Sequence, residues 1–340
     1  MIVNFFFDNR IGGPHINIFR IFRSIKNTKI TNVTIGKSKF GKINLINLRS
    51  FHKILYPLEI IINTIQIIYL FRYKKCVFIS NSILNIAPII AGSILGKKTY
   101  WYLLEEPNFF TKILFKFNNF FFKFTVLSIS KKICINLNIK DYIYFPPYIK
   151  IKSKIKIKKI DKKKLNIFSL GNVNKVKNHY FAVDCLSNYK KQFNYIIIGA
   201  KINTQLKLYQ SIEKLITDKK LNNIKLVGFK KQKTIANVIR SNDIFLLPSK
   251  TEGCPISLIE SMSMGKICIC SKVGDIPMII KNGFNGFLID LNKKSLLRIL
   301  NKIQKLNHKK LEKIQREAIF TIKNKFSNKK LYSDILNYKF

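Results

Sequence analysis

Two glutamates separated by seven residues stand where a buried strand leads through a turn into a helix. Residues 244–247 are all apolar, the Gly- and Pro-containing turn after them holds Glu252, and a helix is expected from Ile256 with Glu260 about one turn inside it. The start of such a helix offers unpaired backbone N–H groups and the positive end of a dipole, which suits phosphate. Paired carboxylates can bind sugar hydroxyls. Either glutamate alone is also typical of an ordinary first-turn or surface position, but together they predict a site for a phosphorylated, hydroxyl-rich ligand.

The rest of the chain supplies the elements that would position this site. Short β-rich apolar runs alternate with longer helical patterns, which is typical of parallel α/β layers. In such sheets, ligands bind at the carboxyl ends of the strands. Strands are expected at residues 2–7, 33–35, 43–46, 77–80, 99–103, 126–128, 166–170, 195–198, 224–227, 244–247 and 267–270. Helices are expected near 15–25, 52–71, 83–95, 108–123, 130–137, 178–190, 204–218, 231–240, 256–264 and 292–324.

The alternation stops once, at a Lys-rich run, and then restarts. The 340 residues suggest two domains. We expect two doubly wound, Rossmann-like α/β domains that face each other across a cleft. The expected parts are an N-terminal domain at 1–148, an exposed basic linker at 149–164, a C-terminal domain at 165–325, and a C-terminal helix at 326–340 that packs back toward the N-terminal domain.

The composition excludes several classes of protein and leaves the charge with two explanations. With 47% hydrophobic and 13% aromatic residues, the chain is neither a disordered basic tail nor a small disulfide scaffold. The net charge of +45 indicates an anionic partner: nucleic acid, a membrane face or phosphorylated substrates. Only eight of the 62 basic residues are Arg, and Lys, Asn, Ile and Phe are all abundant, so drift in base composition explains the excess equally well.

Cysteine and apolar patterns favour a cytoplasmic protein. Six Cys with no C-x-x-C pair, and four His, give no metal-ligand spacing, so free core thiols in a reducing compartment are expected. The N-terminus has no basic region or cleavage site of a signal peptide. The longest apolar stretch, at 54–71, is interrupted by Pro57 and Glu59 and indicates a buried helix rather than a membrane span.

From residue 243 to residue 290, the sequence resembles the donor-binding segment of the family 4 retaining glycosyltransferases (group 1 type), which have the GT-B fold. Their hallmark, E-G-x-P-x-x-x-x-E, is complete from Glu252 to Glu260. The residues at 261–289 match the family's small-residue helix, buried strand, Gly turn and final Gly-containing hairpin. The resemblance extends through the second domain and more weakly into the first.

The resemblance implies roles for further residues of the second domain. The family opens this domain with a strand, then Gly-Arg, then a Lys five residues after that Arg; here Gly171 is followed by Asn172, and Lys177 has the expected place. Lys177 would bind the donor's diphosphate, and Asn172 would donate hydrogen bonds without charge. Glu252 would bind the donor sugar, and Glu260 the ribose. The donor-binding residues expected in all are Gly12, Gly13, Asn172, Lys177, Phe229, Glu252, Ile256, Ser257, Leu258 and Glu260.

In the first domain, the pattern is complete only in part. Gly12 and Gly13 resemble the family's Gly-rich loop, although two glycines after a strand are also common in turns. Many members have a His after the strand at 99–103, where this chain has Glu105 and Glu106. Glu106, slightly preferred over Glu105, would act on the acceptor as an acid/base or as a hydroxyl anchor. A solvated loop pair explains these two glutamates equally well.

The expected activity is transfer of a sugar from a UDP- or GDP-linked donor to a lipid-linked or lipopolysaccharide glycan acceptor, with retention at the anomeric carbon. No D-x-D occurs in the sequence, so we expect no metal and no other cofactor; Glu252, Lys177 and Glu106 are the expected catalytic residues. The alternatives are a GT-B sugar-nucleotide epimerase and a basic polyanion-binding protein. Nucleic acid is not an expected partner.

The stretch at 109–124 combines many Phe with three Lys. It has two interpretations. As an interfacial helix, it would place its rings among lipid headgroups and its lysines against anionic lipid, on the inner face of the plasma membrane. As an ordinary helix, it would bury one face against the first sheet and leave surplus Phe outside.

Overall fold

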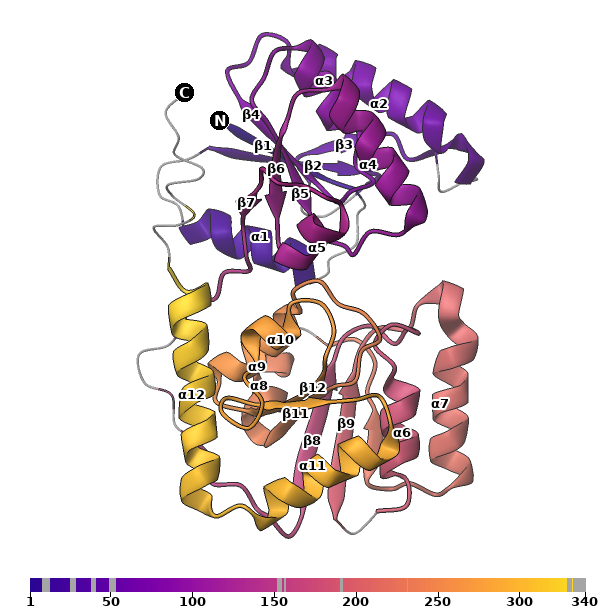
Figure 1. Cartoon of the computed structure of the whole chain (residues 1–340). Coiled ribbons are helices and arrows are strands. Elements are labelled where there is room, and N and C mark those ends of the chain that lie inside the picture. The colour runs from indigo at the N-terminus through magenta and orange to yellow at the C-terminus, as the bar shows by residue number, and fades with distance from the viewer. Residues whose placement is uncertain are drawn as a thin grey trace. The chain divides into compact units, whose positions relative to one another are not determined.

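The computed structural model describes residues 1–7, 13–24, 29–37, 41–48, 53–151, 155, 157–189, 192–230, 232–328 and 332. The chain forms two compact units (Figure 1). The first unit contains Met1–Tyr148 and Lys329–Phe340, and the second contains Ile149–Asn328.

The first unit is built on a seven-stranded parallel sheet with the order β3-β2-β1-β4-β5-β6-β7. Its central strands are buried on both faces, which is why they are nearly continuous apolar runs. The strands are β1 (Ile2–Phe6), β2 (Ile30–Ile35), β3 (Ile43–Leu45), β4 (Val77–Asn81), β5 (Thr99–Leu103), β6 (Thr125–Ser128) and β7 (Ile143–Tyr144).

Three helices of this unit cover one face of the sheet (Figure 1). Ile67 and Phe71 of α2 and Ala91 of α3 share a core with Phe78 of β4. Trp101 of β5, which lies on the same face as Phe78 in register, stacks on Phe115 of α4. The helices are α1 (Gly13–Ser24), α2 (Tyr56–Phe71), α3 (Ala87–Ile94), α4 (Phe109–Phe121) and α5 (Lys131–Asn136).

The second unit repeats the architecture with a six-stranded parallel sheet of order β10-β9-β8-β11-β12-β13. The strands are β8 (Leu165–Leu170), β9 (Phe193–Ile198), β10 (Ile224–Leu226), β11 (Ile244–Leu247), β12 (Ile267–Ser271) and β13 (Phe287–Ile289). The expected final hairpin is wrong, because β13 pairs with β12 in the parallel sense. The predicted α/β class with parallel sheets is confirmed for both units.

Helices surround the second sheet, and one predicted helix is in fact two. Residues 292–324 separate into α11 and α12 because Leu306 is extended and the side chain of Asn307 caps the next helix, accepting from Lys310 N. The helices are α6 (His179–Leu186), α7 (Leu206–Asp218), α8 (Gln232–Ser241), α9 (Ile256–Ser263), α10 (Ile276–Ile279), α11 (Lys293–Lys305) and α12 (His308–Phe326).

The Lys-rich run that the sequence predicts as a linker falls at the start of the second unit. In its described part, Ile160 belongs to the core of that unit, and Lys158 Nζ lies 3.0 Å from the buried carboxylate of Asp243. Among residues 329–340, the described residue is Tyr332, whose hydroxyl donates to the carbonyls of Pro146 and Pro147 at 3.1 Å. Residues 326–328 are also described: α12 ends at Phe326, and residues 327 and 328 are not helical. The other residues of the C-terminal helix predicted at 326–340 lie outside the described part of the chain.

Two further expectations meet the structure here. All six cysteines are buried, and none forms a disulfide. Within the described residues, no helix is long and apolar enough to cross a membrane.

Candidate functional site

The turn after β11 holds Glu252 in a fixed position at the carboxyl edge of the second sheet. Its Oε1 accepts hydrogen bonds from Ser249 Oγ and from Lys177 Nζ, both at 2.6 Å. The Glu252 side chain is 10% exposed and the Lys177 side chain 19%, so their ion pair is largely shielded from water. A carboxylate and an ammonium are thus held together at the end of adjacent strands, although 75 residues separate them in sequence.

Lys177 is carried on the loop between β8 and α6. This loop is attached to the Glu252 turn through the backbone, because Lys250 N donates to Val176 O at 2.8 Å. Its own shape is fixed by Asn174, whose Oδ1 accepts from Lys177 N at 2.8 Å. The two loops therefore form one hydrogen-bonded assembly around the ion pair.

Two glycines permit the close backbone contacts that this assembly needs. Gly274 has a φ of +55°, and a Cβ there would lie 1.8 Å from Glu252 O. A Cβ on Gly199 would lie 1.8 Å from Gly171 O. Side chains at either place would displace the loops that carry Glu252 and Lys177.

The helix after the turn is α9, and its first residues leave two backbone donors. Leu258 N already donates to Pro255 O at 3.1 Å, and the Leu258 side chain is in the core. Ile256 and Ser257, the first two residues of α9, are half-buried, and N–H groups at these positions have no acceptor inside a helix. Glu260 is also half-buried, one turn further on. Together, the shielded ion pair and the start of α9 can bind a phosphorylated, hydroxyl-bearing ligand.

The comparisons with known proteins concern the family and the fold. Residues 150–319, half of the chain, match the family model described as glycosyl transferases group 1. The chain belongs to this family. The group 1 match covers the whole Lys177–Glu252 assembly, so the predicted group 1 membership is confirmed from residues beyond those of the E-x7-E motif alone.

Relatives of the group 1 chain match it over short segments. A UDP-Gal:alpha-D-GlcNAc-diphosphoundecaprenol alpha-1,3-galactosyltransferase of Escherichia coli is 43% identical over 58 residues, which are 17% of this chain and 15% of that protein. The amylovoran biosynthesis glycosyltransferase AmsK of Erwinia amylovora is 35% identical over 135 residues, which are 36% of this chain and 32% of that protein. The matched segments thus span less than a third of either relative.

Solved structures match the whole chain in fold. The structure of Anabaena Alr3699/HepE in complex with UDP and glucose has a TM-score of 0.82 over 98% of each chain, at 14% identity. A glycosyltransferase of Rickettsia africae has a TM-score of 0.75 over 99% of each chain, at 17% identity. At such identities the likeness is one of fold. Together with the two parallel sheets, it confirms the GT-B class.

The remaining predicted donor-binding residues of this group 1 chain lie after other strands, at the start of α1 or outside the described residues. Asn172 is exposed after β8, and Phe229, 68% exposed, follows β10. Gly12 lies outside the described residues, and Gly13 is the first residue of α1 in the first unit. Their part in donor binding stays a prediction.

Glu105 and Glu106 have different partners at the carboxyl edge of the first sheet. Glu106 Oε2 accepts a hydrogen bond from Asn136 Nδ2 at 2.9 Å. Glu105 Oε2 accepts from Ile83 N at 3.3 Å, and desolvation of its carboxyl group raises its pKa. Glu106, the preferred candidate, is therefore tied to α5, and Glu105 is tied to the backbone of the loop after β4. An acid/base role for either stays a prediction.

His179 is a residue of the site that sequence reasoning missed. It is the first residue of α6, two positions after Lys177, and is 1% exposed. Burial, and then the nearby charge of Lys177, lower its pKa to about 4. The ring is therefore neutral near pH 7. From the sequence, His was considered only as a metal ligand. No sequence pattern marks a buried, neutral His beside the lysine.

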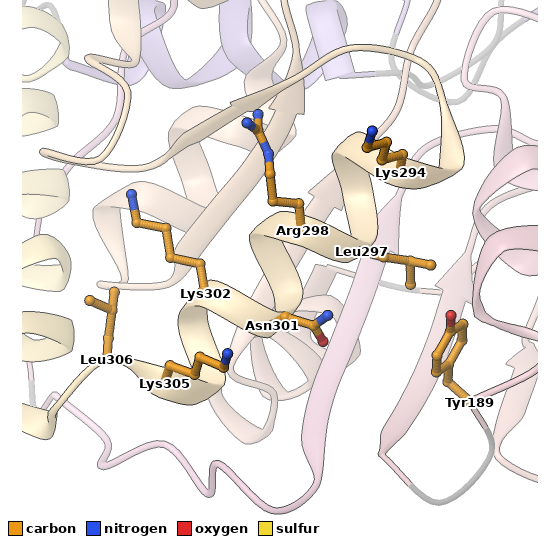
Figure 2. Close-up of a pocket in the computed structure, with 8 residues that line it drawn as sticks. All are labelled: Tyr189, Lys294, Leu297, Arg298, Asn301, Lys302, Lys305 and Leu306. Atoms are coloured by element: carbon orange, nitrogen blue, oxygen red, sulfur yellow. The ribbon is translucent and has the colours of Figure 1, made fainter.

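A second concave surface of the group 1 chain lies on α11 and is separate from this site. Its volume is about 660 Å³, and Figure 2 shows its basic side chains along the outer side of the helix, with Tyr189 beyond them. Tyr189 precedes β9, so this surface lies toward the amino edge of the sheet, whereas the ion pair lies at the carboxyl edge. Within the described residues, no cluster of three or more His, Cys, Asp or Glu is arranged to bind a metal ion.

Proposed function

We propose that the protein is a retaining glycosyltransferase that moves a sugar from a UDP- or GDP-linked donor to a glycan acceptor carried on lipid. The observation that carries this proposal is the shielded Lys177–Glu252 ion pair at the carboxyl edge, next to the start of α9. Membership of the group 1 family supports it. So do a similar structure in complex with UDP-glucose and a relative named for a diphosphoundecaprenol acceptor.

In this proposal, the positive groups bind the donor's diphosphate. Lys177 Nζ and the N–H groups of Ile256 and Ser257 offset the charge that grows on the leaving diphosphate oxygen. Glu252 accepts hydrogen bonds from hydroxyls of the donor sugar and holds Lys177 in place before the donor binds. Glu260 binds the ribose hydroxyls.

The transfer breaks the bond between the anomeric carbon and the diphosphate oxygen, and the acceptor oxygen forms its bond on the same face of the sugar. The acceptor's proton passes to the leaving diphosphate, so no protein base is needed for it. Because Lys177 and α9 supply positive charge at the diphosphate, the proposed reaction does not depend on a metal ion.

The test is a transfer assay after a thermal-stabilisation screen of sugar nucleotides has found the donor. Glu252→Gln and Lys177→Gln are expected to lower kcat/KM by about 100-fold or more, because each removes a charge at the reacting groups. Glu312→Gln and Lys219→Gln are matched controls, since both residues form ion pairs elsewhere in the second unit. Full activity in both site variants would refute the proposal.

Two further readouts separate the remaining parts of the proposal. NMR of the product should show the anomeric configuration of the donor, and inversion would contradict retention. A chelator should leave the rate unchanged; loss of activity restored by a divalent ion would contradict metal independence. Conversion of the donor without any acceptor would indicate an epimerase instead.

A further inference from the structure

Helix α4 presents its apolar side to solvent and its less apolar side to the protein. The buried residues are Thr111, Phe115 and Asn118, two of which are polar. Six bulky apolar residues are 53–84% exposed and recur at helical spacing on the opposite side: Phe109, Phe110, Ile113, Phe117, Phe120 and Phe121. Folding against the sheet therefore accounts for Phe115 but for none of these six.

Helix α2 has the same reversed arrangement. Its buried side includes Glu59, Asn63 and Thr64, besides Ile67 and Phe71. The opposite side carries a stripe that is 48–68% exposed, formed by Leu58, Ile61, Ile65 and Tyr69. A helix stabilised only by its own domain would place such a stripe inward.

The two stripes point to the same side of the first unit. Helix α2 packs along α3, and α3 is linked to the end of α4, where Lys123 N donates to Ser93 Oγ at 3.3 Å. All three helices cover one face of the sheet (Figure 1), and each stripe lies opposite its helix's buried side. We call the two stripes together the outer apolar face.

Basic residues border this face without exposed acids among them. The C-terminal ends of α2, α3 and α4 are followed by a basic rim, and α4 itself carries Lys112 and Lys116, both exposed. Residues 60–104 and 107–124 contain no Asp or Glu, and Glu59 is 1% exposed. The basic rim consists of Arg72, Lys74, Lys75, Lys97, Lys98 and Lys123.

We propose that the outer apolar face docks on an anionic lipid bilayer. Transfer of Phe and Ile side chains from water to the boundary between headgroups and acyl chains lowers the free energy, and lysines beside them are attracted to anionic headgroups. A second copy of the chain suits this surface poorly, because pairing two such faces would bring like charges together. The helices lie in the interface rather than spanning it, in keeping with their length and charge.

The docking does not rest on the proposed transfer reaction, since it is measured without a donor. The full chain is mixed with vesicles of phosphatidylcholine alone, or with 30–40% phosphatidylglycerol (about the anionic content that gives a strong surface potential), and is then sedimented. Wild-type protein should sediment with the anionic vesicles. The triple variant Phe117→Ser, Phe120→Ser and Phe121→Ser should bind about 100-fold more weakly.

Two sets of controls use residues of equal kind elsewhere. Leu206→Ser, Phe284→Ser and Phe320→Ser remove three exposed apolar side chains from the second unit and should leave binding unchanged. Lys112→Gln, Lys116→Gln and Lys123→Gln should weaken binding about tenfold or more, and the loss should shrink in high salt. The same substitutions at Lys294, Lys302 and Lys305, which line the concave surface of Figure 2, should weaken it less than about threefold.

A fluorescence measurement identifies the docked face without any variant. Trp101 is the chain's single Trp, is fully buried, and lies under α4 with its ring 5.4 Å from that of Phe115. Energy transfer from Trp101 to a dansyl-labelled lipid should therefore appear on addition of anionic vesicles. Because its emission reports the packing under α4, it also checks that the Phe variants are folded.

Four results would overturn the proposal. The first is absence of wild-type binding to anionic vesicles, and the second is equal binding by wild type and the triple Phe variant. The third is loss of binding on changing the α11 lysines but not the α4 lysines, which would place the contact on the second unit. A dimer that the Phe substitutions dissociate, with no lipid dependence, would assign the face to a second copy instead.

Discussion

Helices α4 and α11 both flank a parallel sheet, and they are built in opposite ways. Helix α11 buries Leu296, Ile299, Leu300 and Ile303, and turns its basic residues to water. Helix α4 buries one Phe with a Thr and an Asn, and turns its other aromatic residues outward. The α11 arrangement is explained by folding alone. The α4 arrangement needs a second environment. The comparison therefore distinguishes apolar residues that stabilise the fold, as in α11, from apolar residues that serve binding at the surface, as in α4.

The two units differ in a second way, in the groups that they bury. The second unit encloses ionisable side chains: Asp243 is paired with Lys158, and Lys266, 4% exposed, donates to the carbonyls of Arg240 and Asn242. His179 is enclosed beside the site. The outer helices of the first unit bury a single charged side chain, that of Glu59, and their lysines and Arg72 lie on α4 or at the basic rim. Ionisation should therefore affect the second unit more, and lipid the first.

The largest effect that tests the contrast is on stability, within α4 itself. Phe115→Ala should lower the free energy of unfolding by about 3–5 kcal/mol, because it leaves a cavity between α4 and Trp101. Phe117→Ala, two residues away and 59% exposed, should change it by less than about 0.5 kcal/mol. Urea unfolding followed by Trp101 fluorescence measures both. Equal losses would mean that the outward rings are part of the core after all.

The pH dependence of His179 gives the next largest effect, in the second unit. Its pKa is about 4 when folded, below the ordinary value of 6.5, so between these values the unfolded chain binds more protons. The neutral ring's advantage is fully present above pH 6.5 and is lost as the pH falls toward 4, at a cost of about 3 kcal/mol.

Two histidine variants isolate this contribution from that of the carboxylates. His179→Gln should flatten the stability profile between pH 4 and 6.5, and His308→Gln, at an exposed position on α12, should leave it unchanged. NMR titration of the ring gives an independent readout. A His179 resonance that titrates near pH 6.5 in the folded protein would contradict the buried, neutral ring.

The sequence predicted most of the sheet because buried parallel strands are continuous apolar runs. The bounds 99–103 and 244–247 agree with β5 and β11, whereas the two-residue β7 has too little pattern to detect. The break between α11 and α12 was missed because it contains neither Gly nor Pro; Asn307 makes it by capping.

The site was predictable only in part, because its residues are far apart in the sequence and meet only in the folded chain. Glu252 is marked by its own turn, but a single Lys among many is identified by its place in the family pattern, not by its chemistry. That Lys177 and Glu252 form an ion pair depends on β8 and β11 being neighbours, which periodicity does not reveal. Periodicity likewise shows that α4 is amphipathic, but not which of its sides faces the sheet.

The smallest expected effect is on protein stability, from substitution of surface lysines on α11 and α4. The two pairs of substitutions should change stability in opposite directions. Lys302 and Lys305 lie in the last turn of α11, where positive charge is favourable to the helix dipole, and α4 has no basic residue in its last turn. Lys302→Gln with Lys305→Gln should therefore destabilise the protein, by about 0.3–1 kcal/mol for each lysine.

On α4, the corresponding change should act in the opposite direction. Lys112→Gln with Lys116→Gln should stabilise the protein by up to about 0.5 kcal/mol at low salt, because both lie in a chain of net charge +45 and far from the helix C-terminus. Thermal unfolding in the absence of vesicles measures both pairs, and added salt should reduce both differences. If the two α4 substitutions instead destabilise the free protein, then Lys112 and Lys116 contribute to folding. Their position beside the outer apolar face would then no longer support a role in lipid binding.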